Sequence, residues 1–391
     1  MTLNQSSLNV KRRTGAAVTI LIVFAAMYGK RLFVPRPSDF NISSVDERPV
    51  ITGEPRYEVR DASHGRTQSV HSAAAVETKS GKLIAFWYGG SREGARDVAL
   101  YSSTFSSQTR QWGPETVVLT REQLQGQLRR NIRKLGNPVV LRDARNRLWL
   151  FFVSVSLGGW SGSSINFMMS DDEGRHWSPA RRLVSSPFLN ISTLVKGSPF
   201  LYSDQSIGLP VYHELFGKFG EILRLDGEGN VLDKSRLSWG RYSIQPEIVP
   251  MSARTAVGFM RYTGKPPLRM LMLRTEDAGR HWGEPWKIGL PNPNAAVDSL
   301  RLDNGDLLLV FNNAEDSRGD LSLGYSRDQG RTWRVIHEVE RKMVDAGQGA
   351  QEYSYPWLTR TSDGNYHLFY TWRRTHIRHV TFNQAWLEKK R

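Results

Sequence analysis

The stretch Ser326-Arg-Asp-Gln-Gly-Arg-Thr-Trp333 decides the fold, because the chain contains its frame three times. The other copies stand at residues 170–177 and 275–282, and all three read Ser/Thr-x-Asp-x-Gly-x-x-Trp. In a tight turn the Ser/Thr and Asp side chains can accept hydrogen bonds from backbone N–H groups, and Gly supplies a conformation with φ > 0. The Trp adds a large apolar face that packs between sheets. Three copies in one register predict a repeated β-hairpin.

A longer repeat runs through the rest of the chain. In six segments a turn signal precedes an apolar run of strand length, and these segments are residues 81–88, 146–153, 206–212, 254–260, 305–311 and 364–370. Their starts are between 48 residues (206 to 254) and 65 residues (81 to 146) apart, which suits a four-stranded propeller blade with its loops. The short frame follows the second, fourth and fifth segments, as the outer hairpin of a blade should, and Trp112 marks a degenerate copy after the first. The sequence therefore predicts an all-β fold, a six-bladed β-propeller over residues 56–385.

The eight-residue frame is the Asp-box, and the chain resembles the BNR/Asp-box group of sialidase-like β-propellers. Members of that group share the stretches Glu-x-Ser-Tyr-Pro and Tyr-Thr-Trp-x-Arg, which stand here at 352–356 and 370–374. The resemblance covers about residues 55–385. It implies a propeller of the sialidase type and a glycoside hydrolase that needs no cofactor. The implied substrate is an acidic sugar, sialic acid or a uronate, of a glycoconjugate or exopolysaccharide.

Composition narrows the classes of partner. The chain has 391 residues and a formal charge of +15, with 34 Gly, 18 Pro, 12 Trp and 13 Tyr. Because the basic residues are spread along the chain rather than gathered in one run, the charge favours an anionic substrate or a membrane surface over nucleic acid. The absence of Cys excludes disulfides and thiolate metal sites, and the nine His lack the spacing of metal ligands. We therefore expect no metal site and no nucleic-acid partner.

The beginning of the chain has the pattern of an export signal. Basic residues at 11–13 precede an uncharged apolar run over 15–29, and Lys30 and Arg31 follow it. The run is shorter than the roughly 20 residues of a comfortable transmembrane helix. Residues 32–34 extend it if the two basic side chains reach toward the interface.

These observations predict four parts. Residues 1–34 are expected to form an uncleaved signal anchor that crosses the membrane through 15–34 and places the propeller outside the cytosol, in the periplasm or the extracellular space. The alternative is a cleaved signal peptide and secretion. Residues 35–55 read as a Pro-containing linker to the propeller, and residues 386–391 as a C-terminal tail.

The ligand site of a propeller lies on its axis, where inner-strand ends from all blades converge, so its residues recur at blade intervals. In the first blade the resemblance implies that Asp97, in a Gly-rich loop 26 residues after His71 (71 to 97), is the catalytic acid/base. His71 stands where the family has the first arginine of a carboxylate-binding triad, and a satisfied core histidine is its alternative role. Arg92 and Glu93 add charges to the same loop and are candidate substrate contacts.

The third and fourth blades add five candidates. Lys196 and Glu214 fall where inner-strand ends should meet the axis, although a solvated rim explains them almost as well. Arg261 matches the second arginine of the triad. Direct alignment places Gln245 where the family has the Glu that activates the nucleophile, while Glu247 stands two residues on. Because side chains alternate along a strand, both should face the same side, and Glu247 can serve after a small shift.

The last two blades complete the set. Arg318 resembles the third arginine of the triad, and Arg374 ends the stretch after the sixth repeat strand. Tyr355 stands eight residues before Asp363, the spacing at which the family places its nucleophilic Tyr. Tyr353, two residues away and on the same side by alternation, is the alternative nucleophile, and a core aromatic role remains open for both.

Together these residues make chemical sense. Two guanidiniums can hold a carboxylate through charge-assisted, bidentate hydrogen bonds. A neighbouring carboxylate can take the phenol's proton and make Tyr a nucleophile, and a phenol avoids repulsion with an anionic sugar. Asp97 would then donate a proton to the leaving oxygen. The departures at His71 and Gln245 bear more on sialic acid as the substrate than on glycoside cleavage, and they leave two alternatives: a polysaccharide lyase acting on a uronate, with a tyrosine as base, and a non-catalytic glycan-binding propeller.

Overall fold

The computed structural model describes residues 15, 18–19, 37–42, 53–186, 190–239, 242–341 and 351–391. Contacts divide the chain into two units, Met1–Pro37 and Ser38–Arg391. Within the described residues, no helix is both long and apolar enough to cross a membrane. The expected signal anchor lies almost entirely outside the described residues, so the structure gives no support to an anchor helix.

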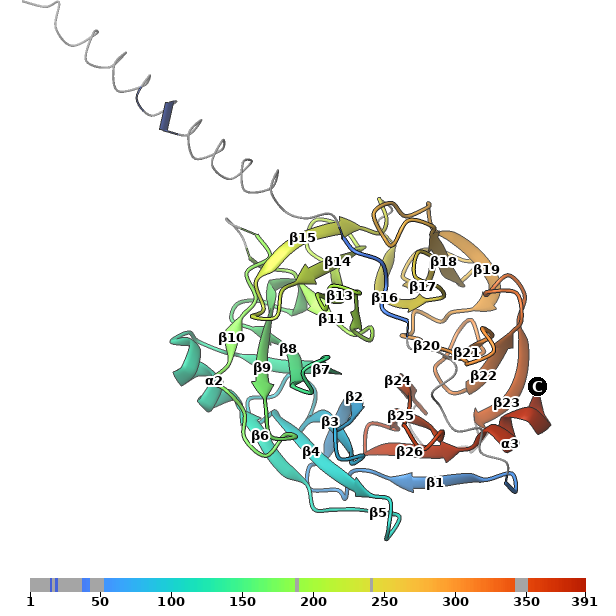
Figure 1. Ribbon diagram of the computed structural model, residues 1–391. Helices are drawn as coiled ribbons and strands as arrows, with labels where there is room; N and C mark the ends of the chain where they lie inside the picture. The colour runs from blue at the N-terminus through green and yellow to red at the C-terminus, as the bar shows by residue number, and fades with distance from the viewer. Residues whose placement is uncertain are drawn as a thin grey trace, which may run out of the picture. The chain divides into compact units, whose positions relative to one another are not determined.

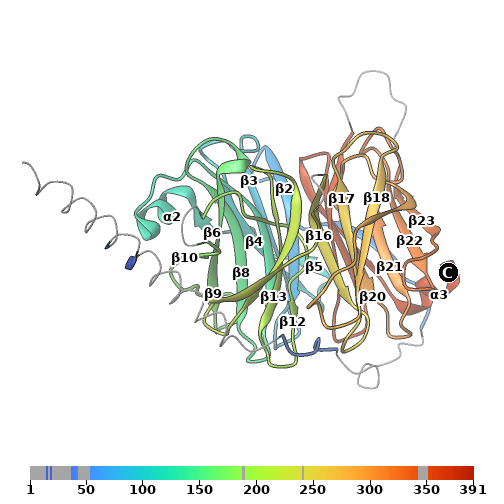
Figure 2. The same ribbon diagram turned by 90° about the horizontal axis from the view of Figure 1, so that it is seen from above.

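The second unit is a ring of six antiparallel sheets, each of them one blade (Figure 1). Strands of neighbouring blades run side by side along the ring axis (Figure 2). The first blade contains β2 (Ser69–Glu77), β3 (Leu83–Gly90), β4 (Ala99–Ser106), β5 (Gln111–Trp112) and β6 (Thr116–Thr120). The second contains β7 (Lys134–Arg142), β8 (Leu148–Val155), β9 (Ser163–Ser170) and β10 (Arg181–Arg182). The third contains β11 (Leu194–Val195), β12 (Phe200–Leu201), β13 (Ile207–His213), β14 (Phe219–Leu225) and β15 (Val231–Arg236).

The other three blades have four strands each. The fourth contains β16 (Ser243–Pro250), β17 (Ala256–Tyr262), β18 (Arg269–Thr275) and β19 (Trp286–Pro291). The fifth contains β20 (Asp298–Arg301), β21 (Leu307–Phe311), β22 (Leu321–Ser326) and β23 (Arg334–Glu340). The sixth contains β24 (Tyr353–Arg360), β25 (Tyr366–Trp372), β26 (His376–Phe382) and β1 (Tyr57–Asp61). Short helices are α2 (Arg121–Leu128), η2 (Trp160–Gly162) and α3 (Gln384–Lys390).

The six apolar repeat segments are the strands β3, β8, β13, β17, β21 and β25, one in each blade. Each lies between two other strands of its sheet, where both faces are covered, and every residue of β3, β8 and β21 is buried. The continuous apolar character of these segments follows from that burial. The predicted six-bladed propeller is confirmed.

The three Asp-boxes join the third strand to the fourth in blades two, four and five. In the first copy the N–H of Gly174 donates to the Ser170 hydroxyl, and the N–H of His176 donates to the Asp172 carboxylate, both at 2.9 Å. The same two bonds recur in the other copies at 2.8 to 3.0 Å. Gly174 has a φ of 83°, in the left-handed region that glycine enters without strain. The hairpin is thus held by contacts within eight residues.

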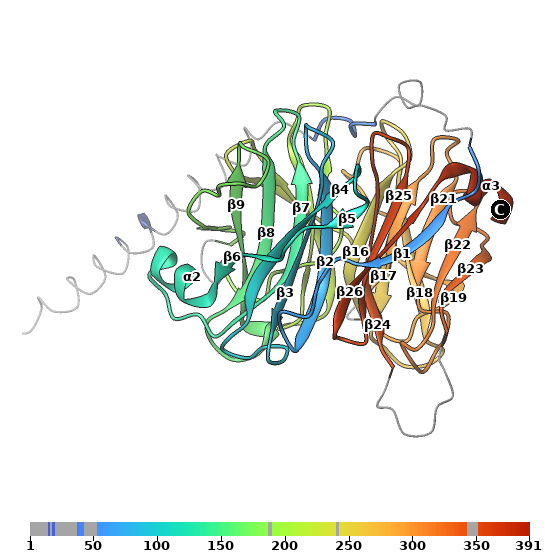
Figure 3. The same ribbon diagram turned by 90° about the horizontal axis from the view of Figure 1, so that it is seen from below.

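The ring closes through a strand from the N-terminal side. β1 pairs antiparallel with β26, with Tyr57 opposite Phe382, so the sixth blade combines segments from both ends of the propeller (Figure 3). Of the residues expected to form a C-terminal tail, 386–390 lie in α3, which Asn383 caps and which buries Trp386. Part of the expected linker is also docked, since Phe40 is 2% exposed and stacks on Tyr202.

A β-bulge interrupts the innermost strand of four blades. The register shifts within β2, β7, β16 and β24, and the bulge residues with positive φ are Ser72 (56°), Asn137 (46°), Gln245 (51°) and Tyr355 (52°). A bulge places an extra residue in the strand and re-aims the neighbouring side chains. The alternation that placed Gln245 with Glu247, and Tyr355 with Tyr353, therefore does not hold.

Candidate active site

Tyr355 lies in a network centred on Gln245. The Gln245 amide nitrogen donates to the Tyr355 hydroxyl at 3.1 Å and lies 3.3 Å from the Tyr212 hydroxyl. Its carbonyl oxygen accepts from Nη1 of Arg261 at 3.1 Å. Because a guanidinium only donates, Arg261 fixes the orientation of the amide and turns its NH2 toward the two tyrosines. One side chain thereby joins the phenol to an arginine.

His71 packs against the same phenol. Its ring centroid lies 4.4 Å from that of Tyr355, and it meets Tyr88 edge-on at 5.7 Å. Burial, followed by the charge of Arg374, lowers the pKa of His71 to about 4, so the imidazole is neutral at neutral pH. Its Nδ1 is buried and has no hydrogen-bond partner among the described residues. The first-triad position thus holds a neutral ring in place of a cation.

A cluster of two arginines and two carboxylates forms the next part of the site. Glu352 accepts from Nη1 of Arg318 at 3.0 Å and from Nε of Arg374 at 2.7 Å. Arg374 also binds Glu93 at 2.5 Å. Burial alone would raise the pKa of Glu352, but its hydrogen bonds and the charge of Arg374 outweigh burial and lower it to about 2. Two predicted residues, Arg318 and Arg374, therefore meet on Glu352, a carboxylate that the sequence analysis did not single out, and Arg374 joins the predicted Glu93 to it.

Asn294 connects this cluster to the Gln245 network. Its side-chain oxygen accepts from Nε of Arg261 at 2.6 Å, and its backbone carbonyl accepts from Nη2 of Arg318 at 2.6 Å. Asn294 has a φ of 55°, a conformation that Asn adopts more readily than most residues. The structure thus brings the second and third predicted triad arginines together.

Of the two acidic candidates in the loop after β3, Glu93 contacts the arginine cluster and Asp97 has no described contact with it. Glu93 reaches Arg374, whereas Asp97 is exposed and accepts hydrogen bonds from the backbone and hydroxyl of Ser91 at 2.8 and 2.9 Å. Arg92 is exposed in the same loop. The described contacts of Asp97 are therefore local and do not join it to Tyr355.

Lys196 and Glu247 belong to a separate buried group. Lys196 is 3% exposed, which excludes the solvated rim, and its Nζ donates to Asp298 at 3.2 Å. Glu247 is 1% exposed and accepts from the backbone N–H of Ser198 at 3.0 Å. Burial, and then the charge of Asp298, raises the pKa of Glu247 well above its usual range. Its described hydrogen bond is thus to Ser198, while Gln245 contacts the phenol.

The two remaining candidates have different surroundings. Tyr353 is 1% exposed and packs with Val310 and Tyr370 in the core between blades five and six. Its position favours Tyr355 over Tyr353 as the site tyrosine. Glu214 is half-buried, and its backbone N–H donates to the Ser192 hydroxyl at 2.9 Å.

Sequence reasoning missed Glu352, Asn294, Tyr212 and Tyr88. Glu352 carried a signal, since it opens the Glu-x-Ser-Tyr-Pro stretch. The other three are ordinary residues in sequence. Only the folded ring brings Tyr212 to Gln245, Tyr88 to His71 and Asn294 to the two arginines.

The family described as BNR repeat-like domain matches residues 81–368, and a search of curated proteins gives no match. Among solved structures, a Hadza microbial sialidase, Hz136, is similar with a TM-score of 0.68 and 19% identity, covering 85% of this chain and 69% of its own. The intramolecular trans-sialidase from Ruminococcus gnavus gives 0.65 and 14%, covering 90% and 99%. The Trypanosoma rangeli sialidase gives 0.61 and 12%, covering 83% and 56%. These likenesses show that the fold is that of sialidase propellers.

Proposed function

Because the chain belongs to the BNR repeat-like domain family, we propose that it is a sialidase-like glycoside hydrolase acting on an anionic sugar at the site around Tyr355. The similar structures include sialidases and a trans-sialidase, which supports a glycoside hydrolase-like or glycan-binding protein. The observation that carries the proposal is the Gln245 bridge, which joins the Tyr355 hydroxyl and the Arg261 guanidinium at 3.1 Å each. A nucleophile and a cationic anchor are thereby held around one side chain.

Arg261 is the best anchor for the anion. Its described partners are the amide oxygens of Gln245 and Asn294, which are uncharged, whereas Arg318 and Arg374 already pair with Glu352. Charge-assisted hydrogen bonds are about twice as strong as neutral ones. A substrate carboxylate beside Arg261 would therefore gain a charged partner without displacing an internal ion pair.

Tyr355 supplies the nucleophile. Its oxygen would form a bond to the anomeric carbon as the glycosidic C–O bond breaks, and Asp97 would protonate the leaving oxygen. For this role Asp97 must first give up the hydrogen bonds that it accepts from Ser91. The phenol proton cannot pass to Gln245, since an amide is not a base. The neutral imidazole of His71 packs on the ring of Tyr355 and would have to turn toward the hydroxyl to accept the proton. Its pKa of about 4 makes it a weak base.

Gln245 also favours a second candidate, a glycan-binding propeller without turnover. An amide at this position retains the hydrogen bonds that hold Tyr355 and Arg261 but lacks the carboxylate that activates a phenol. Such a site keeps its affinity for an anionic sugar and loses its chemistry.

The deciding experiment assays the full-length protein on fluorogenic α-sialosides, uronides and neutral glycosides, together with Y355F and Y353F. Release of an anionic sugar that Y355F abolishes and Y353F retains would establish the hydrolase. Y353F is a matched control because it removes a hydroxyl from the core beside the site. A product that absorbs in the near ultraviolet would indicate a lyase instead. Saturable binding without turnover would favour the glycan-binding protein.

We further propose, on the sequence pattern alone, that the protein is exported and held at a membrane by residues 15–34. Fractionation of cells that express the full-length chain tests this. Recovery in the soluble cytosolic fraction would contradict it, and recovery in the medium with a shortened N-terminus would indicate a cleaved signal.

A further inference from the structure

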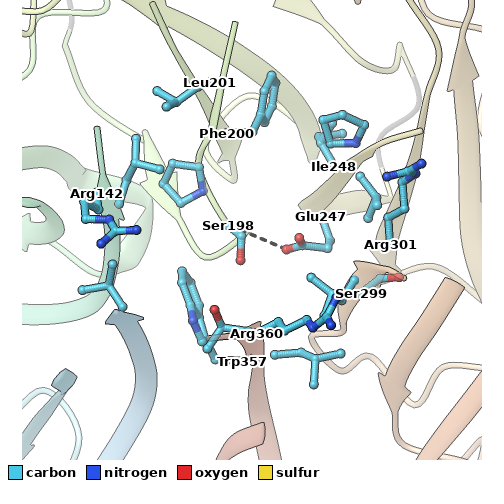
Figure 4. Close-up of a pocket in the computed structure, with 18 of the residues that line it drawn as sticks. Arg142, Ser198, Phe200, Leu201, Glu247, Ile248, Ser299, Arg301, Trp357 and Arg360 are labelled. Atoms are coloured by element: carbon cyan, nitrogen blue, oxygen red, sulfur yellow. Dashed lines mark hydrogen bonds between the residues drawn. The ribbon is translucent and has the colours of Figure 1, made fainter. Parts of the chain in front are cut away.

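A cavity of about 440 Å³ lies at the end of the innermost strands, away from the site around Tyr355 (Figure 4). It is lined by the last residues of five of these strands, which are Glu77 (β2), Arg142 (β7), Pro250 (β16), Arg301 (β20) and Arg360 (β24). Tyr355, Gln245 and Arg261 are not among its lining residues. Its volume falls within the range of about 300–1,000 Å³ typical of small-molecule sites.

Three of those strands end in arginine, so guanidiniums from blades two, five and six line one cavity. Figure 4 shows Arg142 and Arg301 on opposite sides, with Arg360 at the lower edge between them. Arg142 donates to the backbone carbonyl of Thr78 at 2.7 Å, and Arg360 pairs with Asp303. A planar guanidinium presents donors in a fork that matches the oxygens of a carboxylate or phosphate.

Arg301 is the arginine best placed to take a ligand. Its Nε is buried and has no hydrogen-bond partner among the described residues, and the same holds for Nε of Arg360. Buried polar atoms are nearly always paired in folded proteins, so each exception calls for an explanation. Because both Nε atoms are buried, an oxyanion in the cavity would bind the terminal nitrogens of Arg301, and would reach its Nε only after the side chain turns.

The acidic groups of the cavity are already engaged. Glu77 accepts from the backbone and hydroxyl of Ser362, and Asp303 pairs with Arg360. Glu247 accepts from the backbone N–H of Ser198 on the cavity wall (Figure 4). Of the three guanidiniums, only that of Arg360 pairs with a carboxylate of the cavity, Asp303, while Glu77 is held by Ser362. The pKa of Glu247, the third carboxyl group, is raised by burial. The balance is cationic.

We propose that this cavity binds a small molecule bearing an oxyanion, a carboxylate or a phosphate, with Arg301 as the principal ligand and Arg142 and Arg360 beside it. The size of the cavity suits a monosaccharide derivative. This site is separate from the one around Tyr355 and does not depend on the proposed hydrolase activity.

The test measures binding by calorimetry at constant ionic strength, with inorganic phosphate, glucuronate and glucose as probes and chloride as the balancing salt. We expect saturable binding of phosphate, glucuronate or both, weakened about tenfold or more in R301Q, and no saturable binding of glucose in this cavity. R142Q is a second variant with the same expected direction. R331Q, which removes an exposed arginine of the third Asp-box, should bind as the unchanged protein does.

The R261Q variant distinguishes anion binding in this cavity from anion binding at the site around Tyr355. Anion binding that persists in R261Q and is lost in R301Q supports the proposal, and the probe that binds identifies the kind of oxyanion. Binding lost in R261Q and retained in R301Q would assign the anion to the Tyr355 site and overturn it. Absence of saturable binding by either anion to the folded protein would also overturn it, whatever the result of the hydrolase assay.

Discussion

Nζ of Lys196 donates a 2.7 Å hydrogen bond to the carbonyl oxygen of Pro356, the residue that follows Tyr355. Its other acceptors are the backbone carbonyl of Val297 at 2.8 Å and the carboxylate of Asp298 at 3.2 Å. A side chain of blade three thereby binds blades five and six beside the bulge that carries the phenol. Lys196 supports the site from within the protein.

Loss of this contact should destabilise the ring. We expect K196M to lower the free energy of unfolding by about 3–5 kcal/mol, because removal of one partner of a buried ion pair leaves the other uncompensated. Urea denaturation measures this, with K79M, at an exposed lysine, as the control. K196M combined with D298N should recover part of the loss. A change below about 1 kcal/mol in K196M would contradict a structural role.

Arg261 should make the site bind anionic sugars more tightly than neutral ones. We expect R261Q to weaken binding of an anionic sugar about 10- to 100-fold, since hydrogen bonds to charged groups contribute about 1.5–3 kcal/mol. Binding of the corresponding neutral sugar should change little. Calorimetry with both sugars measures the difference, and R261K, which keeps the charge but loses the fork, should fall between. Equal weakening for both sugars would assign Arg261 to the fold of the site instead.

A carboxylate at position 245 should act as a general base that accepts the proton of the Tyr355 hydroxyl. We expect Q245E to raise turnover of an anionic glycoside about tenfold or more, because a positioned general base typically contributes about 10²–10⁴-fold. Q245M, which has neither base nor hydrogen bonds, should lower it. The rates as a function of pH check the prediction, since the gain in Q245E should disappear once the new carboxylate is protonated. A Q245E enzyme slower than the unchanged protein at every pH would exclude this role for position 245.

His71 should make the protein sensitive to acid. Its pKa is about 4 in the folded state and about 6.5 when exposed, so the unfolded chain binds more protons between these values and stability falls as pH drops from 6.5 toward 4. We expect about 2–3 kcal/mol to be lost between pH 7 and pH 4.5 from this group. H71Q should abolish that loss, whereas H176Q, at a histidine whose side chain is 90% exposed, should retain it. Urea denaturation at both pH values measures the difference, and equal slopes in H71Q and the unchanged protein would refute it.

The fold was predictable because its signals are local. An Asp-box closes its hairpin with bonds between residues four apart, and the second strand of each blade is a continuous apolar run. The sequence also named residues that the fold connects, since Gln245 joins Arg261 to Tyr355, and Arg318 and Arg374 meet on Glu352. Their roles stay predictions. The choice between Gln245 and Glu247 could not be made by alternation, because the bulge at Gln245 breaks the strand's period. A signal existed in Pro138, Pro246 and Pro356, each directly after a bulge residue, since proline inside a strand is typical of bulges.

The pairing of β1 with β26 in blade six has a consequence for folding during synthesis. Its outer strand β1 leaves the ribosome early, while its partner β26 comes almost last, about 300 residues later. At about 5–20 residues per second, β1 waits roughly 15–60 s with its pairing edge unsatisfied. During that interval the nascent chain exposes a strand edge to its neighbours, so its yield should depend on holdase chaperones at the moment of translation.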